Sequence, residues 1–300
     1  MKVLVTGACG FLARELISVL EQHGHDLLLL DFVDPKEATV FVPGALEREF
    51  KPLVTDWPYV RADVTDVVAM QEVVEGIEGI IHLSGLTTGL PDVGVPTFRV
   101  NALGTFVVLD TARKAGVSRV ICASSINAFG TFYWRLSGKP VVYTKMPLDE
   151  SFPPVPEDPY SLSKLVNEET CAAFTRAYGI TTAAMRFAGV WSHEMYEKAY
   201  DHLEPTTSWN DDLYSWVHVT DIVEGLRTAL EASNLPESGV YTLSGVDTRC
   251  PEPTMQLLER FRPDLARTVE TPLKGHEPLL SIQHAREAFG YAPRYVLASL

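Results

Sequence analysis

The stretch VTGACGFLARELI, residues 5–17, places a glycine turn between a strand-like run and a helical pattern. In such a turn, Gly7 permits a tight bend and Gly10 lets the backbone approach a pyrophosphate. Phe11 and Leu12 begin the helix, whose first amides point toward an anion. Because the turn lies at the first strand–helix junction, it predicts that these residues bind a dinucleotide.

The second strand-like run, DLLLL (26–30), is followed directly by an acidic residue. Asp31 lies 21 residues after Gly10, where a carboxylate can accept hydrogen bonds from an adenosine ribose. It would repel a 2′-phosphate, and Phe32 follows it where an arginine would favour one. The pattern predicts NAD rather than NADP as the cofactor, and a solvated turn residue is the alternative for Asp31.

Strand-like and helical segments alternate through the first two thirds of the chain. The strand-like runs are apolar on both faces, which is typical of parallel strands covered by helices on each side. This alternation predicts an α/β fold with a doubly wound parallel Rossmann sheet. The predicted strands are 2–6, 26–30, 59–62, 79–83, 119–124 and 181–187, and the predicted helices are about 11–23, 66–75, 97–115 and 160–178.

The alternation ends after the sixth strand. The segment WVHVT leads into a helix with Thr220 or Asp221 as its N-cap, and VYTLSG (240–245) is one more predicted strand. Ser281 is expected to cap a short helix that ends at Gly290.

This organisation predicts two unequal parts. We expect an NAD-binding Rossmann domain that carries the catalytic residues at 1–187, and a small C-terminal substrate lobe at 188–300, interleaved with late Rossmann elements. Clusters of proline and glycine predict loops over the carboxyl edge of the sheet at 91–96, 138–159 and 251–253.

The composition limits the partners. Of 300 residues, 46% are hydrophobic and 21% charged, as in ordinary globular proteins, and a formal net charge of −14 argues against a nucleic-acid partner. The chain has no run of about 18 apolar residues, so we expect no membrane span. A strand directly after Met1 leaves no room for a signal peptide. The four cysteines and eight histidines show no metal-ligand spacing, so we expect no metal and a cytoplasmic protein with reduced thiols.

Five short motifs give the chain a resemblance to a known superfamily, the extended short-chain dehydrogenases/reductases, which include the NAD-dependent epimerases and dehydratases. The resemblance covers residues 1 to about 190 and resumes at 215–226, and Ala13 stands where the family usually has glycine. The motifs, in the family's order, are TGACGFLA (6–13), ADV (62–64), HLSG (82–85), ASSINAFG (123–130) and YSLSK (160–164).

The resemblance implies roles for individual residues. Ser125 would bind the reacting oxygen, with Ser124 as the alternative, and Tyr160 and Lys164 would form the catalytic pair. Further residues implied to line or support the cofactor site are Asp63, Val64, Leu83, Ser84, Gly85 and Asn101.

Tyr160 and Lys164 share one face of a helix because they are four residues apart. A phenol titrates near pH 10, so lowering its pKa by three takes about 4 kcal/mol. The ammonium and the positive nicotinamide both favour the phenolate. Tyr160 would then remove an alcohol proton as hydride passes to NAD, while Ser125 orients the oxygen and Lys164 also holds the nicotinamide ribose. An ordinary surface pair is the alternative.

The expected substrate is a small carbohydrate-like molecule. Nucleotide-sugar enzymes of the superfamily have a long insertion and an R-x-x-N-V-Y-G-P motif, whereas this chain has 29 residues at 187–215 and reads RFAGVWSH at 186–193. The compact lobe instead resembles the uronate dehydrogenases, which oxidise a free sugar acid. Their pattern of two serines followed by G-F-Y is partly present in ASSINAFGTFYWR (123–135).

Two residues are candidates for binding this substrate. By the same resemblance, Arg186 would pair with a substrate carboxylate, and a salt bridge to a neighbouring acid is the equal alternative. Asn127 could donate to a substrate hydroxyl. The aromatic segment 129–147 could cover the substrate or serve as a hydrophobic anchor for a long loop.

The leading hypothesis is therefore an NAD-dependent dehydrogenase acting on a secondary alcohol. The first alternative is an epimerase or dehydratase that keeps its NAD and returns the hydride, and the second is a non-catalytic NAD-binding regulator. By the resemblance, we also expect a homodimer that packs through the helices at about 97–115 and 160–178. Their apolar faces carry Phe106, Val107, Leu109, Leu165, Val166 and Phe174.

Overall fold

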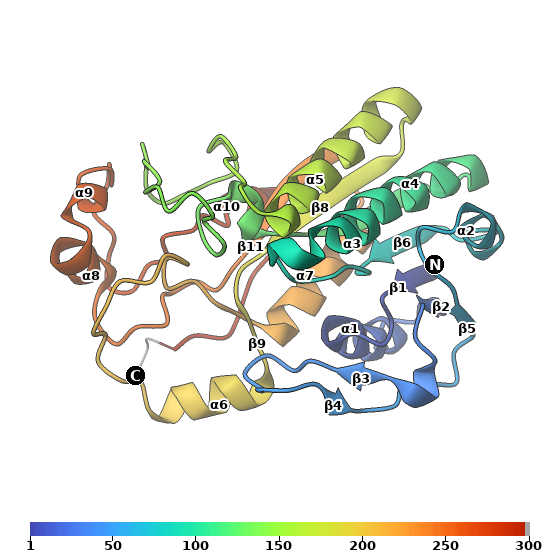
Figure 1. Cartoon of the computed structure of the whole chain (residues 1–300), viewed down its shortest axis with the longest axis horizontal. Helices are drawn as coiled ribbons and strands as arrows, with labels where there is room; N and C mark the ends of the chain where they lie inside the picture. The colour runs from blue at the N-terminus through green and yellow to red at the C-terminus, as the bar shows by residue number, and fades with distance from the viewer. Residues whose placement is uncertain (298–300) are drawn as a thin grey trace.

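A wholly parallel sheet of seven strands, in the order β11-β8-β7-β6-β1-β2-β5, forms the centre of the computed structural model, which describes residues 1–297 (Figure 1). Residues 298–300 of the predicted lobe lie outside the described residues. The chain moves outward from β1 through β2 to β5 and then returns to β6 on the other side, which is the predicted doubly wound order. The strands are β1 (Lys2–Thr6), β2 (Asp26–Asp31), β5 (Tyr59–Arg61), β6 (Gly79–His82), β7 (Arg119–Ser125), β8 (Thr181–Phe187) and β11 (Ser238–Leu243).

Helices cover both faces of the sheet, and each face has its own hydrophobic core. Leu16 and Leu226 belong to the core on one face, and Met70 and Val108 belong to the core on the other. Figure 1 shows α4 and α5 side by side on one side of the sheet and α1 on the other. The helices of the first face are α1 (Phe11–Gln22), α7 (Val219–Glu231) and α10 (Gln283–Phe289), and those of the second are α2 (Val67–Val73), α4 (Gly104–Ala115) and α5 (Pro159–Tyr178).

Shorter elements lie in the connections and in the C-terminal part. The strands β11 and β8 are neighbours, so residues from beyond the predicted boundary at 187 complete the main sheet. The shorter elements are η1 (Pro35–Glu37), β3 (Thr39–Val40), β4 (Glu49–Phe50), η2 (Pro91–Val93), α3 (Gly94–Phe98), η3 (Arg99–Leu103), η4 (Ile126–Phe129), β9 (Val190–Trp191), α6 (His193–Asp201), β10 (Val217–His218), α8 (Thr254–Phe261) and α9 (Pro263–Ala266).

The structure corrects the predicted helix at 97–115 and the loop at 91–96. Residues 91–115 form one nearly continuous helical path, in which η2 and α3 precede the π-helical turn η3, and α4 follows. Pro91 and Pro96 lie in the first turns of their helices, where proline is tolerated because the amide it lacks would have no helical partner. A π-helical turn inserts one extra residue, which the 3.6-residue period does not reveal.

The predicted N-cap of α7 is also wrong. The helix begins at Val219 with His218 as its cap, whose ring nitrogen Nδ1 accepts from the amide of Thr220 at 3.2 Å. The Asp221 carboxylate instead accepts from the amides of Arg294 and Tyr295, and so holds the C-terminal segment. The other predicted cap is one residue too early: Ile282 is the N-cap of α10, although Ser281 Oγ accepts from the amide of Gln283. The helix is followed by Gly290 at its C-terminal cap, as predicted.

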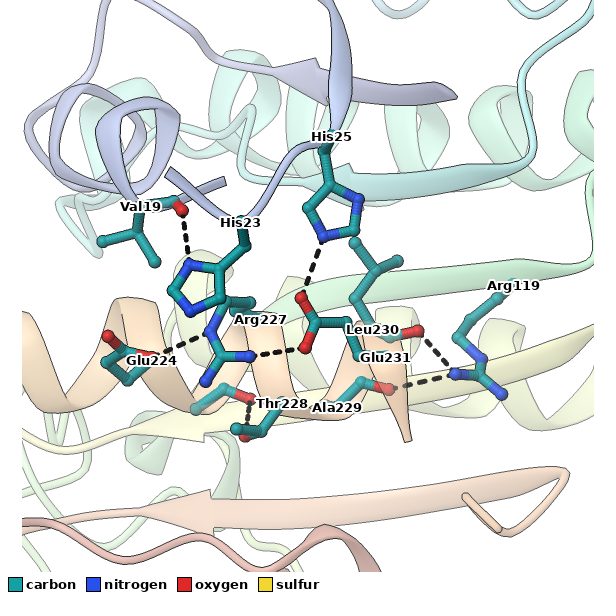
Figure 2. A network of polar contacts seen from close by, with 11 residues as sticks. Val19, His23, His25, Arg119, Glu224, Arg227, Thr228, Ala229, Leu230 and Glu231 are labelled. Atoms are coloured by element: carbon teal, nitrogen blue, oxygen red, sulfur yellow. Dashed lines mark hydrogen bonds and ion pairs between the residues drawn. The ribbon is translucent and has the colours of Figure 1, made fainter. Parts of the chain in front are cut away.

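Polar contacts fasten α7 to the residue before β2 and to the start of β7, at the edge opposite the carboxyl ends of the strands (Figure 2). Glu231 at the end of α7 lies 2.9 Å from the ring nitrogen Nε2 of His25. His25 is buried and directly precedes β2. Arg227 pairs with Glu224 and Glu231 along the same helix. Arg119 of β7 donates to the last carbonyl groups of α7. A cation at the C-terminus of a helix is favourable because the unpaired carbonyls are partly negative.

Candidate active site

The glycine turn packs directly against the segment that follows β6. Gly7 has φ of +73°, and a Cβ there would lie 2.8 Å from the amide nitrogen of Ser84 and 2.9 Å from the carbonyl carbon of Leu83. Only glycine combines this backbone conformation with so close an approach. Gly10 caps α1 without a side-chain hydrogen bond, so the first amides of the helix, from Phe11 on, have no side-chain acceptor.

Asp31 ends β2 beside this turn, as predicted. Its carboxylate accepts from the amide of Cys9 at 3.0 Å and from that of Val33 at 3.3 Å. Burial raises the pKa of Asp31, while the amide hydrogen bonds and the nearby Arg14 lower it. A buried acid is thus fixed at the end of the second strand.

The segment after β6 is held in place by Asn101. The amides of Leu83 and Ser84 donate to the carbonyl and the hydroxyl of Thr6, which fixes them next to the glycine turn. Asn101 is buried in the π-helical turn η3, and it accepts from the amide of Leu86 at 2.7 Å and donates to Leu86 and Ser163 at 3.0 Å each. Asn101 therefore links the predicted cofactor segment to α5.

Asp63 and Val64 lie after β5, the strand that borders β2. Asp63 Oδ1 accepts from the amide and the hydroxyl of Thr65 at 2.8 and 2.9 Å. Val64 is buried in the core beneath Gly104. Contact of these residues with an adenine remains a prediction.

Tyr160 and Lys164 lie on α5 and face the end of β7. Asp158 starts this helix by accepting from the amides of Tyr160 and Ser161 at 2.9 Å each. Burial raises the pKa of Tyr160 to about 12, opposed by a hydrogen bond from Ser125. Lys164 Nζ lies 5.6 Å from the centre of the Tyr160 ring, and burial lowers its pKa to about 8. The three predicted catalytic side chains are therefore together.

The structure distinguishes the two candidate serines. Consecutive strand residues point to opposite faces. Ser125 ends β7 near Tyr160, whose pKa it lowers, and its hydroxyl accepts from the amide of Asn127 at 3.2 Å. Ser124 instead donates to the buried Glu168 at 2.6 Å. Ser125 is thus the serine that faces the tyrosine.

Arg186 of β8 makes a buried ion pair. Its Nε and Nη2 donate to the two carboxylate oxygens of Glu168 at 2.8 and 2.7 Å. The guanidinium also lies over the ring of Phe129. Of the two roles considered for Arg186, the salt bridge to a neighbouring acid is the arrangement present in the structure. Binding of a substrate carboxylate remains a prediction.

The aromatic segment 129–147 contacts both Tyr160 and the C-terminal part. Trp134 packs edge-on against the Tyr160 ring, with 5.8 Å between the ring centres, and has a left-handed backbone with φ of 56°. The Tyr133 hydroxyl donates to Asp212 at 2.8 Å, and Asp212 pairs with Arg249. The segment is thus anchored to the lobe at Tyr133 and lies against the tyrosine at Trp134.

Sequence reasoning missed two buried acids of this site, Asp158 and Glu168. An aspartate directly before Pro159 is a recognisable N-cap signal that could have been used. Glu168 had no such signal, because the sequence offers Glu169 beside it. Within residues 1–297, no group of three or more His, Cys, Asp or Glu side chains could hold a metal ion, and no helix there is long and apolar enough to cross a membrane.

A serine–tyrosine–lysine group beside a parallel sheet, with a glycine turn after the first strand and a buried acid at the end of the second, is the arrangement of an enzyme of the short-chain dehydrogenase/reductase type. The chain belongs to the NAD-dependent epimerase/dehydratase family, whose family model matches residues 3–244. This membership confirms the predicted superfamily, the enzyme class and NAD as the cofactor.

Individual relatives divide between two activities. The uronate dehydrogenase of Pseudomonas putida is 30% identical over 245 residues, which cover 81% of this chain and 76% of that protein. The UDP-glucose 4-epimerase of Corynebacterium glutamicum is 23% identical over a match that covers 98% of this chain and 92% of that protein. A short-chain dehydrogenase/reductase superfamily protein from Agrobacterium tumefaciens, solved with bound NAD, has a TM-score of 0.67 at 20% identity and covers 99% of this chain and 94% of its own.

Proposed function

We propose that this protein is an NAD-dependent dehydrogenase that oxidises a secondary alcohol of a small sugar, sugar acid or polyol. The observation that carries the proposal is that Tyr160 and Lys164 lie together at the end of β7, with the Lys164 ammonium 5.6 Å from the centre of the phenol ring and Ser125 near enough to lower the pKa of Tyr160. Bound NAD supplies the hydride acceptor. Tyr160 accepts the proton of the alcohol, Ser125 holds the alcohol oxygen, and Lys164 favours the phenolate and holds the nicotinamide ribose.

The residues of the glycine turn fit the cofactor. The close approach at Gly7 leaves no room for a side chain, and the uncapped amides at the start of α1 suit a pyrophosphate. Asp31 would bind the adenosine ribose. Contacts with Asp63, Val64, Leu83, Ser84 and Gly85 complete the proposed cofactor site, and Asn101 supports it.

Two observations favour a small polar substrate. Asn127 follows Ser125 in the structure, and its carbonyl oxygen Oδ1 is buried without a hydrogen-bond partner. A buried acceptor of this kind is costly unless a ligand donates to it, and a sugar hydroxyl is such a donor. Trp134 covers the edge of Tyr160 and offers an aromatic surface for a sugar ring. The similarity to a uronate dehydrogenase supports a sugar acid as the first compound to test.

A substrate panel tests this function. The chain, saturated with NAD, is mixed separately with aldoses, uronic acids, polyols and UDP-sugars, and the absorbance of reduced NAD is recorded. We expect reduced NAD to accumulate with a member of the first three groups. Failure of all of them to reduce NAD would refute the dehydrogenase.

The second candidate is an epimerase that retains its NAD, which the full-length similarity to a UDP-glucose 4-epimerase favours. The same Tyr160 would then return the proton it removed. Conversion of UDP-glucose to UDP-galactose without net reduction of added NAD would establish this activity instead.

We place the enzyme in the cytoplasm. Cys122 and Cys171 are buried in the same hydrophobic core beside α5, and both are free thiols. Unpaired thiols are typical of a reducing compartment. Detection of the chain outside the cytoplasmic fraction of its source cells would contradict this placement.

Replacement of Asp31 by alanine is expected to reduce the preference for NAD over NADP. Loss of a charged acceptor to the ribose costs about 1.5–3 kcal/mol of NAD binding. The dissociation constant of NADP divided by that of NAD should therefore fall roughly 10- to 100-fold. Fluorescence titration with each cofactor measures the ratio. Glu37→Ala, an exposed acid in the same connection, should leave it unchanged. Tighter binding of NADP by the wild type would contradict the role of Asp31.

We also propose that the chain forms a homodimer through α3, α4 and α5. Of the apolar residues named from the sequence, Val107, Leu109 and Phe174 are buried in the core of the single chain, so they are not available to a partner. Other apolar side chains on these adjoining helices are well exposed, and burying them would stabilise a dimer. They are Phe98, Leu103, Phe106 and Leu162.

A glutamate at position 106 should abolish this dimer. The Phe106→Glu chain is expected to scatter light as a particle of 33.2 kDa, and the wild type as a particle of twice that mass. A charge at the centre of a buried apolar interface lacks a partner. Leu46→Glu introduces the same charge at a fully exposed position in the connection before β4, and should remain dimeric. A wild type of 33.2 kDa at micromolar concentration would refute the dimer.

A further inference from the structure

A buried carboxylate beneath the proposed catalytic group has a full set of hydrogen-bond donors. Glu168 is 4% exposed, and it accepts from Ser124 and from two nitrogens of Arg186, all within 2.8 Å. Neither Glu168 nor Arg186 belongs to the proposed chemistry. The question is what this pair does there.

Glu168 joins three elements at the point where Ser125 is presented. It lies one turn after Lys164 on α5, and Ser124 and Arg186 are paired opposite each other on the neighbouring strands β7 and β8. The Lys164 ammonium donates to the carbonyl of Ala123 at 2.9 Å. The two residues that precede Ser125 are therefore both held by side chains of α5, one by Lys164 and one by Glu168.

The charges around Lys164 make Glu168 relevant to its protonation. Burial and the nearby His82 are unfavourable surroundings for an ammonium, but His82 stays neutral because burial lowers its pKa to about 3. Two groups raise the pKa of Lys164 against the larger effect of burial: Cys122 from β7 and, to a smaller extent, Glu168 on the helix of Lys164 itself. Arg186 is paired with Glu168, so the charges of these two side chains offset each other.

We propose that Glu168 is a positioning residue that keeps Lys164 charged and holds Ser125 at Tyr160, with Arg186 as the partner that fixes its carboxylate. The proposal rests on the proposed roles of Lys164 and Ser125. A role limited to fold stability would be the bland alternative, because a buried ion pair that loses one member always destabilises. The test must therefore separate positioning from stability.

The test compares Glu168→Gln with the double variant Glu168→Gln/Arg186→Met. Glutamine keeps the shape and a hydrogen bond to Ser124 but removes the charge. The double variant also removes the unpaired cation, so it should fold even if the single variant fails to fold. Circular dichroism checks both. Glu169→Gln, the same substitution at the exposed neighbour, is the matched control.

NAD affinity is measured from pH 6 to 10 by fluorescence titration, with Lys164→Met as the reference that lacks the titrating group. We expect the pH at which affinity falls to move down by about one unit in Glu168→Gln, because Lys164 loses its proton more readily when the acid is gone and Arg186 keeps its charge. The shift should be smaller in the double variant, which loses both members of the ion pair. With an aldose or polyol from the panel, which has no carboxylate for Arg186 to bind, kcat should fall roughly tenfold or more while KM changes less than about threefold.

A folded Glu168→Gln chain with the wild-type NAD curve, or a double variant with the wild-type kcat, would overturn the proposal and leave the pair a purely structural role. The NAD readout does not need turnover. Absence of turnover by the wild type on every compound would refute the proposed function, whereas the NAD titration would still decide the role of Glu168.

Discussion

Replacing Tyr160 with phenylalanine is expected to lower kcat by about 10²- to 10⁴-fold, the usual contribution of a general acid or base. The substitution removes one hydroxyl and its interaction with Ser125, but keeps the ring that packs against Trp134. The loss should therefore fall on the chemical step, and the NAD dissociation constant should stay within about twofold of the wild type. Turnover and cofactor titration measure the two effects.

The matched control is Tyr178→Phe, at the far end of the same helix, where the ring is largely exposed. It should retain wild-type activity. The rate of the wild type should also rise with pH, because burial raises the pKa of Tyr160 and the base form must be present for oxidation. Near-wild-type turnover by Tyr160→Phe would show that the proposed mechanism is wrong even though the family is right.

Replacing Lys164 with methionine should have opposite effects on activity and on stability. The ammonium is assigned to both the phenol and the nicotinamide ribose, so we expect kcat/KM to fall by about 10²-fold or more and NAD to bind roughly tenfold more weakly. In the absence of NAD, however, the variant should unfold at higher urea concentration than the wild type.

The stability gain follows from the pKa of Lys164, which falls from 10.5 to about 8 because the charge is buried. Burying this charge costs roughly 3 kcal/mol of folding stability at pH 7, which the variant recovers. The variant also loses the hydrogen bond to Ala123, at a cost of about 1 kcal/mol, so its free energy of unfolding should rise by about 2 kcal/mol. Between pH 8 and 10.5 the unfolded chain binds more protons than the folded chain, so wild-type stability rises with pH, and this rise should be absent from the variant.

Urea unfolding without NAD at pH 7 and at pH 9.5 measures both expectations. Lys198→Met makes the same substitution at an exposed position on α6, and should change neither stability nor its pH dependence. A Lys164→Met chain less stable than the wild type at pH 7 would contradict the assigned cost of burying this charge.

The parts of the site that could be predicted from the sequence have local patterns. One strand–helix–strand unit contains Gly7, Gly10 and Asp31, so their spacing alone places them together. Tyr160 and Lys164 are one helical turn apart, and their orientation follows from the period of the helix. In these cases the residues that must meet are close in the sequence or joined by a standard connection.

The parts that could not be predicted depend on contacts between distant segments. The choice between Ser124 and Ser125 depended on where α5 begins relative to the end of β7, because Ser124 contacts Glu168 and Ser125 lies near Tyr160 of the same helix, and no pattern within the strand shows this. Arg186 was equally suited to a substrate carboxylate and to an acid of the protein, and only the packing of α5 on β8 brings Glu168 to it. Asp221 is a favourable capping residue, but a segment 73 residues later uses its carboxylate.

The position of β11 beside β8 has a consequence for synthesis of the chain on the ribosome. When residues 1–187 have emerged, all the predicted catalytic residues are present, but β8 is still an open sheet edge and α7 is not yet there to cover the surface of α1. Exposed edges and bare apolar faces make a nascent chain prone to aggregation until its last third arrives. Cutting the gene after codon 187 should therefore give insoluble material rather than a separate cofactor-binding module.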